Sequence, residues 1–299
     1  MNERRLVADI GGTNARLGLS QGGALEAGSI RSYRNDEFSS FDDVIRRYMA
    51  DLPDASFSDA VLAVAGPVHA GKAQLTNRNW QFDSDQMLQD FQGREFSLLN
   101  DLAALGQACC ALPPESLETL YASDAQAQAE TQALVIGIGT GFNVSPVVQT
   151  VDHVDGLEVE YGHISLPLDV AVKLRDRLGE SAAAFLTIEH VFSGRGYKAL
   201  SDIATEGSST DGEAAAMQRE FDTFYATLLA ILTRNLMQAF LPRRGIFFAG
   251  GVARHLLTSD VGSAFVDAVR QPFELNTIQM APVHIILDDA AALKGCASY

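Results

Sequence analysis

Two segments of the chain share one pattern, in which an apolar strand, a short turn with glycine and threonine, and a second apolar strand follow one another. The first reads LVADIGGTNARLGLS over residues 6–20, and the second reads ALVIGIGTGFNVSPVVQ over residues 133–149. Each begins a stretch in which strand-like and helix-like segments alternate. The repetition predicts an α/β protein with an internal duplication, in which each half begins with a hairpin.

The turns of these hairpins indicate a binding function. Glycine permits positive φ and lets a bulky anion approach the main chain, while successive N–H groups form a nest of partial positive charge. Threonine and asparagine add hydrogen-bond donors without adding charge. One such turn alone is also explained as an ordinary tight hairpin. Two of them together favour a pair of phosphate-binding turns, formed by Gly11, Gly12, Thr13 and Asn14 in the first half and by Gly139, Thr140 and Gly141 in the second.

Composition disfavours several classes of protein. The 299 residues include 38 acidic and 22 basic side chains, for a formal net charge of −16, and no basic stripe is interleaved with aromatic residues. A surface for nucleic acid or for an anionic membrane is therefore not expected. No apolar run approaches the roughly 20 residues of a membrane span, and the N-terminus has no signal-peptide core, so we expect a cytoplasmic protein. The three cysteines show neither a disulfide framework nor metal-ligand spacing.

Two glycine-rich segments resemble nucleotide-binding motifs but lack the structural context of those motifs. GPVHAGKA, residues 66–73, nearly spells a P-loop, but Ala73 stands where the Mg²⁺-binding hydroxyl belongs, and no helix is predicted to follow. GIGTGF, residues 137–142, lacks the third glycine of a dinucleotide-binding fingerprint and leads into a strand rather than a helix. We therefore expect neither a P-loop nor a dinucleotide site.

Polar residues near the ends of predicted strands are candidates for site groups. Asn100 and Asp101 end the buried segment FSLLND, where open α/β sheets bind ligands, although an aspartate there also serves as a helix cap. EVEYGH contains Glu160 and His163, and FLTIEHVFSGRG contains Glu189. By themselves, these last three side chains are more simply explained as surface residues. The sequence around them shows no recognisable metal-ligand pattern.

The order and spacing of seven motifs resemble one known family. The motifs are DIGGTNARLGL, LTNRNW, LLNDLAAL, GIGTGF, EYGH, IEHVFSGRG and FFAGGV, and they span most of the chain, from Asp9 to about Val252. They are similar to those of the bacterial ATP-dependent glucokinases, within the actin-like sugar kinase superfamily. The resemblance implies two actin-like (ribonuclease H-like) α/β domains flanking a deep cleft. It places a small domain at residues 1–105, with a C-terminal helix at 288–299 packing back on it, and a large domain at 106–287.

The resemblance also implies a role for each candidate residue. Asp101 would be the catalytic base that deprotonates the sugar 6-hydroxyl, and Asp9 would hold Mg²⁺ through water. The ATP phosphates would lie on the two glycine turns. The hydroxyls of the sugar would be bound by Asn100, Asp101, Glu160, His163 and Glu189. The adenosine pocket would be lined by Gly250 and Gly251. The implied reaction is transfer of a phosphoryl group from MgATP to a hexose, with glucose as the expected substrate.

The chain departs from the family pattern beside the expected sugar site. Tyr161 stands where many relatives have glycine, and a phenol there is expected to narrow the pocket or shift the sugar preference. Asn143 follows the second turn where glycine is more usual. The cysteine-rich zinc motif and the helix-turn-helix segment of related repressors are missing, so we do not expect a repressor. A kinase of fructose or mannose and a catalytically weak sugar sensor stay open as alternatives. A homodimer, and polyphosphate as the donor, stay open too.

Overall fold

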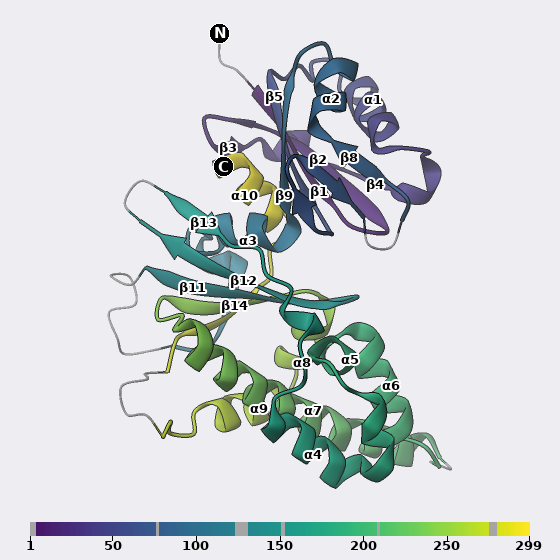
Figure 1. Ribbon diagram of the computed structural model, residues 1–299, viewed down its shortest axis with the longest axis vertical. Coiled ribbons are helices and arrows are strands. Elements are labelled where there is room, and N and C mark those ends of the chain that lie inside the picture. The colour runs from purple at the N-terminus through teal and green to yellow at the C-terminus, as the bar shows by residue number, and fades with distance from the viewer. Residues whose placement is uncertain (1–3, 76–77, 123–130, 151–152, 208–209, 275–279) are drawn as a thin grey trace. The chain divides into compact units, whose positions relative to one another are not determined.

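The computed structural model describes residues 4–75, 78–122, 131–150, 153–207, 210–274 and 280–299. The chain forms two compact units, and Figure 1 labels most of their helices and strands. The first unit contains Met1–Leu112, Val154–Gly156 and Asp288–Tyr299, and the second contains Pro113–His153 and Leu157–Leu287. The C-terminal segment is therefore part of the first unit.

The sheet of the first unit brings three strand ends side by side. Its strands are β1 (Arg4–Ile10), β2 (Asn14–Gln21), β3 (Ala24–Leu25), β4 (Arg31–Arg34), β5 (Asp59–Val64) and β9 (Glu95–Asn100). They lie in the order β3-β2-β1-β5-β9, and β4 also pairs with β2. β1 and β2 are antiparallel, whereas β1, β5 and β9 are parallel, with Ile10, Val64 and Asn100 in one row of the register. The carboxyl ends of the three parallel strands therefore meet at one edge.

Helices cover both faces of this sheet. They are α1 (Phe41–Asp51), α2 (Ser84–Asp90), α3 (Asp101–Cys109) and α10 (Ala291–Ser298). α1 packs on one face through Phe41 and Tyr48, and α3 and α10 pack on the other through Ala104 and Leu293. Gly295 allows α10 to approach α3, because a Cβ at this position would overlap the carbonyl oxygen of Ala104. The predicted helix near the C-terminus thus forms part of the core of the first unit.

The segment that resembles a P-loop folds as a hairpin. β6 (Val68–His69), β7 (Lys72–Gln74) and β8 (Gln81–Asp83) form a small antiparallel sheet in that order. Ala70 and Gly71 make the turn between β6 and β7, with φ of 49° and 72°. Lys72 forms an ion pair with Asp83 at 2.8 Å. The prediction that this segment is not a P-loop is confirmed, because a strand stands where the helix of a P-loop would begin.

The sheet of the second unit repeats the arrangement of the first. Its strands β10 (Leu117–Tyr121), β15 (Val283–Ile286), β14 (Gly245–Ala249), β11 (Gln132–Ile138) and β12 (Phe142–Gln149) lie in that order. β11 is antiparallel to β12 and parallel to β14, which is parallel to β15. In the first unit, β1 is likewise antiparallel to β2 and parallel to β5, which is parallel to β9. The predicted duplication is therefore confirmed. The short strand β13 (Val154–Gly156) is grouped with the first unit, where it contacts α3.

A long helix forms the centre of the second unit's core. Residues Tyr225, Leu229 and Leu236 of α7 (Asp211–Phe240) are almost entirely buried in a cluster that includes Ile136 and Phe248 of the sheet. The other helices of the unit are α4 (Leu168–Leu178), α5 (Ile188–Phe192), α6 (Gly194–Ala204), α8 (Gly251–Leu257) and α9 (Gly262–Val269). Short 3₁₀ helices in the chain are η1 (Ala27–Ser29), η2 (Asn35–Glu37), η3 (Pro114–Ser116), η5 (Tyr161–His163) and η6 (Gly179–Ala184). No helix in the described ranges is long and apolar enough to cross a membrane.

Candidate active site

The first glycine turn connects β1 to β2 at the edge where β1, β5 and β9 end. The amide of Gly11 donates to the carbonyl oxygen of Asn14 at 3.0 Å, which closes the turn, and the side chains of Thr13 and Asn14 are exposed. Gly11 does not take a positive φ, and a Cβ on it would find no atom closer than 3.6 Å. The sequence analysis expected glycine here because it permits positive φ. The structure shows that positive φ is not the reason. At Gly11 the main chain of the turn simply carries no side chain, and the space around it would also hold a Cβ.

Asp9 is the penultimate residue of β1 and lies opposite Arg16 of β2. Its side chain is only partly exposed, and burial raises its pKa to about 6; the charge of Arg16 lowers the pKa, and the charge of Asp289 raises it. Gly137 has the equivalent place in β11, so the hairpin of the second unit carries no carboxylate there. The two duplicated hairpins thus differ in one chemical group.

This donor set fits a hard cation that is bound mainly by phosphate. Among the described residues, no three His, Cys, Asp or Glu side chains gather in a way that could hold a metal ion. Mg²⁺ usually keeps several waters and is bound through one or two carboxylates together with substrate phosphates. Asp9 is one such carboxylate and lies beside the first glycine turn, and its raised pKa indicates a carboxylate that a nearby cation would stabilise.

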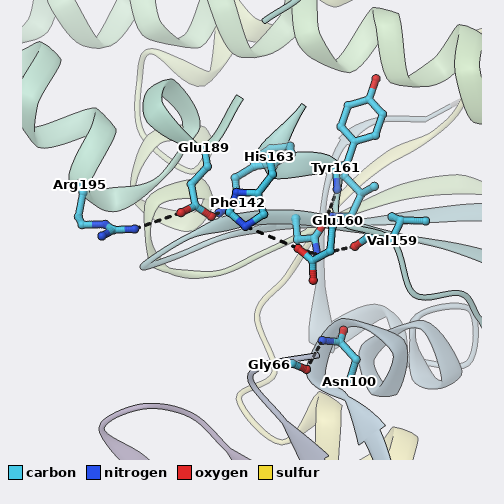
Figure 2. Close-up of polar contacts among 11 residues, drawn as sticks. Gly66, Asn100, Phe142, Val159, Glu160, Tyr161, His163, Glu189 and Arg195 are labelled. Atoms are coloured by element: carbon cyan, nitrogen blue, oxygen red, sulfur yellow. Dashed lines mark hydrogen bonds and ion pairs between the residues drawn. The ribbon is translucent and has the colours of Figure 1, made fainter. Parts of the chain in front are cut away.

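Asn100 and Asp101 lie at the same sheet edge, where β9 passes into α3. Asn100 is the N-cap, and its Oδ1 accepts from the amides of Leu102 and Ala103 at 3.0 and 3.4 Å. Its Nδ2 donates to the carbonyl oxygen of Gly66, just after β5, at 3.1 Å (Figure 2). Asp101 is the first residue of α3, and its Oδ1 accepts from Leu102 at 2.9 Å. The sequence analysis left open whether Asp101 serves as a helix cap. In the structure, Asn100 is the main cap of α3.

The second glycine turn, at the end of β11, packs against two other glycines. The amide of Gly139 donates to the carbonyl oxygen of Gly141 at 3.0 Å, and the amide of Gly194, which begins α6, donates to the carbonyl oxygen of Gly139 at 2.7 Å. Gly250, between β14 and α8, has a φ of 97°, and a Cβ there would overlap the carbonyl oxygen of Ile138. The structure thus brings together the residues predicted for the phosphates and the adenosine of this unit, which are Gly139, Thr140, Gly141, Gly250 and Gly251.

Glu160, His163 and Glu189 come together around the start of β12, as Figure 2 shows. The Nε2 atom of His163 lies 3.9 Å from Oε2 of Glu160, and these side chains are 69% and 60% exposed. Glu189 is only 20% exposed, and its Oε2 accepts from the amide of Phe142 at 3.3 Å. A Cβ on Gly141 would lie 2.8 Å from Glu189 Oε2, so a larger residue there would displace this carboxylate. Two carboxylates and an imidazole can together bind neighbouring hydroxyls of a polyol.

Asn143 holds the loop that carries Glu160. Its Nδ2 donates to the carbonyl oxygen of Val159 at 2.5 Å and to Oε2 of Glu160 at 3.4 Å. Its Oδ1 accepts from the amide of Tyr161 at 2.9 Å. A glycine at this position can make none of these contacts. The departure from the family pattern at Asn143 therefore has a structural effect, which is to fix the main chain on both sides of Glu160.

Tyr161 anchors the same loop to the core. Its ring packs edge-on against Phe240 of α7, with the ring centroids 5.7 Å apart, and burial raises the pKa of its phenol. Figure 2 shows the ring and the carboxylate of Glu160 pointing in opposite directions. The next residue, Gly162, needs to be glycine, because a Cβ on it would overlap the carbonyl oxygen of Phe142. The expectation that the phenol narrows a pocket beside the glutamate does not match this placement.

Arg195 belongs to this cluster, although the sequence analysis did not single it out. Its Nη2 donates to Oε1 of Glu189 at 3.1 Å, and its side chain is 80% exposed. It follows Gly194, whose amide bonds to the second glycine turn. The turn itself contains no charged residue, so Arg195 brings a positive charge to its neighbourhood. The available signal was an arginine between two glycines, directly after the segment that contains Glu189.

Comparisons with known proteins identify the family of the chain. A family model described as Glucokinase matches residues 6–299. The glucokinase of Chelativorans sp. strain BNC1 is 29% identical over 314 residues, which cover 98% of this chain and 90% of the relative. The glucokinase of Tolumonas auensis is 29% identical over 323 residues, which cover 100% and 97%. The crystal structure of a glucokinase from an Antarctic psychrotroph has a TM-score of 0.82 and 27% identity, and the match covers 100% of this chain and 98% of that chain.

These similarities assign the duplicated α/β units to the actin-like fold of sugar kinases, and the predicted fold class is confirmed. The chain belongs to the glucokinase family.

Proposed function

We propose that the protein is an ATP-dependent glucokinase, which transfers the γ-phosphoryl group of ATP to the 6-hydroxyl of D-glucose and releases ADP and glucose 6-phosphate. The observation that carries this proposal is the glycine turn that ends the first hairpin strand of each unit, together with Asp101 at the same sheet edge as the first turn. Membership of the glucokinase family supports the same reaction. We also propose that the protein is cytoplasmic and binds neither nucleic acid nor membrane.

Asp101 is the proposed catalytic base. Phosphoryl transfer depends on positioning and charge stabilisation more than on covalent chemistry, so a carboxylate that orients the attacking hydroxyl and accepts its proton is sufficient. The amide of Leu102 holds one oxygen of this carboxylate at 2.9 Å, which orients the side chain at the start of α3. The proton of the sugar 6-hydroxyl passes to Asp101 as the hydroxyl oxygen attacks the γ-phosphorus.

The sugar hydroxyls are bound, in this proposal, by Asn100, Asp101, Glu160, His163 and Glu189. Glu160 is oriented by Asn143, and Glu189 is oriented by Arg195 and by the Phe142 amide. Oriented carboxylates discriminate against sugar analogues that lack a hydroxyl, because such an analogue leaves a desolvated polar group unpaired. The expected domains, residues 1–105 with 288–299 and residues 106–287, differ from the two compact units at residues 106–112 and 154–156, which belong to the first unit.

The ATP phosphates are expected on the two glycine turns, with the adenosine beside Gly250 and Gly251. Backbone N–H groups can hold phosphate without lysine or arginine, which fits a chain with a net charge of −16. Bound Mg²⁺ would neutralise charge on the phosphates, and Asp9 is the residue proposed to hold it through water. Gly250 keeps the start of α8 against the second turn, because no other residue fits over the carbonyl oxygen of Ile138.

A coupled assay tests the proposal. The purified protein is incubated with MgATP and a panel of hexoses, and the formation of ADP and sugar 6-phosphate is measured. We expect glucose to be phosphorylated with the highest kcat/KM of the panel. Parallel reactions with polyphosphate in place of ATP test the identity of the donor.

Each alternative function corresponds to a different outcome of this assay. Efficient turnover of fructose or mannose with inert glucose would reject glucose as the substrate and keep the kinase class. Sugar binding detected by calorimetry without turnover of any hexose would reject the kinase and favour a sugar sensor. Asp101 and both glycine turns argue against the sensor, because a protein that only binds sugar needs neither a base nor a phosphate site.

A variant of Asn143 tests how Glu160 is oriented. Asn143→Gly introduces the residue that is more usual in the family and removes the hydrogen bonds to Val159, Glu160 and Tyr161. A net hydrogen bond contributes about 0.5–1.5 kcal/mol, so we expect the KM for glucose to rise about tenfold with a smaller change in kcat. Steady-state kinetics at saturating MgATP measure both parameters.

Ser145→Ala is the matched control for this variant. Ser145 lies on the same strand, and its hydroxyl donates to the carbonyl oxygen of Leu157 at 2.8 Å, so the variant also removes a hydrogen bond to the neighbouring loop. Ser145 does not contact Glu160, so the KM of the Ser145→Ala variant for glucose should stay within about twofold of the wild type. Equal changes in the two variants would mean that general loosening of the loop, rather than the position of Glu160, sets the affinity for the sugar.

A further inference from the structure

Asn35 lies behind the first glycine turn, although it is distant from the turn in sequence. It begins the 3₁₀ helix η2 after β4, and its exposed fraction is 0%. Its backbone amide donates to the carbonyl oxygen of Thr13 at 2.9 Å, and its Nδ2 donates to the carbonyl oxygen of Gly11 at 2.7 Å. One buried residue thus binds the carbonyl groups on both sides of Gly12.

These two hydrogen bonds fix the directions of N–H groups as well as of carbonyls. A carbonyl and the N–H of the next residue belong to one planar trans peptide group, so they point in opposite directions. Asn35 holds the Gly11 carbonyl from behind and therefore directs the amide of Gly12 away from itself. It fixes the amide of Asn14 through the carbonyl of Thr13 in the same way. Within the described part of the chain, the amides of Gly12 and Thr13 donate to no protein acceptor.

The second unit uses a different donor at the equivalent place. Gly11 and Gly139 each follow the last residue of the first hairpin strand in their unit. The carbonyl oxygen of Gly139 accepts from the amide of Gly194, so this bond likewise directs the next amide, that of Thr140. Both turns are therefore held from behind at the same carbonyl. In the first unit, a side chain supplies the donor.

The other polar atom of the Asn35 side chain shows that the residue is not explained by stability alone. Oδ1 is buried and has no hydrogen-bond partner among the described residues. A buried oxygen without a partner costs free energy of folding, and an apolar side chain of similar shape, such as leucine, avoids that cost. The retained amide offers one compensating contact, which is the bond from Nδ2 to Gly11.

We propose that Asn35 is a positioning residue for the phosphate donor, because it orients the turn amides that bind the phosphates of ATP. This inference rests on the proposed kinase function. It assigns to Asn35 an effect on nucleotide affinity and on the KM for ATP, and none on the affinity for glucose. Asn35 itself does not touch the nucleotide.

Asn35→Leu tests the inference. Leucine keeps the branching at Cγ and the backbone bond to Thr13, and it removes both the donor to Gly11 and the unpaired oxygen. We expect the Kd for a non-hydrolysable ATP analogue with Mg²⁺, measured by calorimetry, to rise about tenfold, the equivalent of one hydrogen bond of about 1.4 kcal/mol. The Kd for glucose should change less than about twofold. The thermal midpoint should shift by only a few degrees.

Two further variants make the result interpretable. Asp36→Asn is the matched control, because Asp36 is the next residue of η2 and forms a surface ion pair with Arg34. It should leave both affinities unchanged. Asn35→Ser is the second variant if Asn35→Leu does not fold; its shorter side chain cannot reach Gly11, so the same loss of nucleotide affinity is expected.

The measurements separate this inference from the proposed function. An unchanged nucleotide Kd in a folded Asn35 variant, or equal losses for nucleotide and glucose, would overturn the role of Asn35 while leaving the kinase intact. A wild-type protein that binds the ATP analogue but phosphorylates no hexose would overturn the proposed function, and the nucleotide Kd ratio would still decide the role of Asn35. Absence of nucleotide binding in the wild type would overturn both.

Discussion

Asp101→Asn is expected to lower kcat by about 10²–10⁴-fold, the usual contribution of a positioned general base, while the KM for glucose changes only a few-fold. Asparagine keeps the size of the side chain and can still accept from the amide of Leu102, but it cannot accept a proton. Steady-state kinetics at saturating MgATP measure the two parameters, and a thermal melt verifies that the variant is folded.

Glu160→Gln is the comparison that distinguishes the loss of a base from the loss of a sugar ligand. A residue that only binds hydroxyls stabilises the ground state and the transition state alike, so its loss should raise KM more than it lowers kcat. A generally damaged protein would instead lose both parameters together. Near-normal kcat in a folded Asp101→Asn protein would restrict Asp101 to orienting the start of α3 or the sugar, and the base would then be sought at Glu160 or Glu189.

The fold could be predicted because its main signals are local. Strand, glycine turn and strand occur twice within short windows, and each hairpin forms with its turn directly between Ile10 and Ala15 or between Ile138 and Phe142. Alternation of strands and helices then indicated an α/β organisation. The strand pairing shows three parallel strands in each unit, with one antiparallel strand beside the first of them. The glycine turns lie where the sequence places them, but neither Gly11 nor Gly141 takes a positive φ, and the role of the turns in binding phosphate stays a prediction.

The residues that orient the site groups could not be predicted, because their contacts depend on packing between segments that are distant in the sequence. Asn35 lies 24 residues from Gly11, and Asn143 lies 16 residues from Val159. A pattern within a short window contains no information about such pairs. Arg195 was missed for a related reason, since its contact with Glu189 depends on the path of the chain from α5 into α6. The sequence therefore indicated which polar residues form the candidate site, and the structure shows which residues orient them.

Asp9→Asn is expected to stabilise the folded protein at neutral pH. Burial raises the pKa of Asp9 from 3.8 to about 6, so the folded state holds this proton more tightly than the unfolded state does. The wild-type protein therefore loses stability as the pH rises from about 4 to about 6, and the full cost is present above that range. Two pKa units correspond to about 3 kcal/mol, and the partial exposure of the side chain reduces the expected gain to about 1–2 kcal/mol.

Urea unfolding of the wild type and the variant measures this gain. The difference in the free energy of unfolding should be present at pH 7 and vanish near pH 4, where both states of the wild-type protein carry the proton. Glu37→Gln removes one negative charge at an exposed position and controls for the change in net charge from −16. A gain of the same size in Glu37→Gln would assign the effect to net charge instead of to burial of Asp9.

The same variant is expected to lose activity, with kcat/KM for MgATP lower by about 100-fold, because charge stabilisation around the transferring phosphoryl group is one of the largest contributions to such a reaction. Increased stability together with lost activity is the pattern of a functional carboxylate in a poorly solvated position. Raising the Mg²⁺ concentration should recover part of the activity if Asp9 holds the cation, and should recover none if Asp9 only orients Arg16. A variant that is more stable and fully active would remove Asp9 from the site.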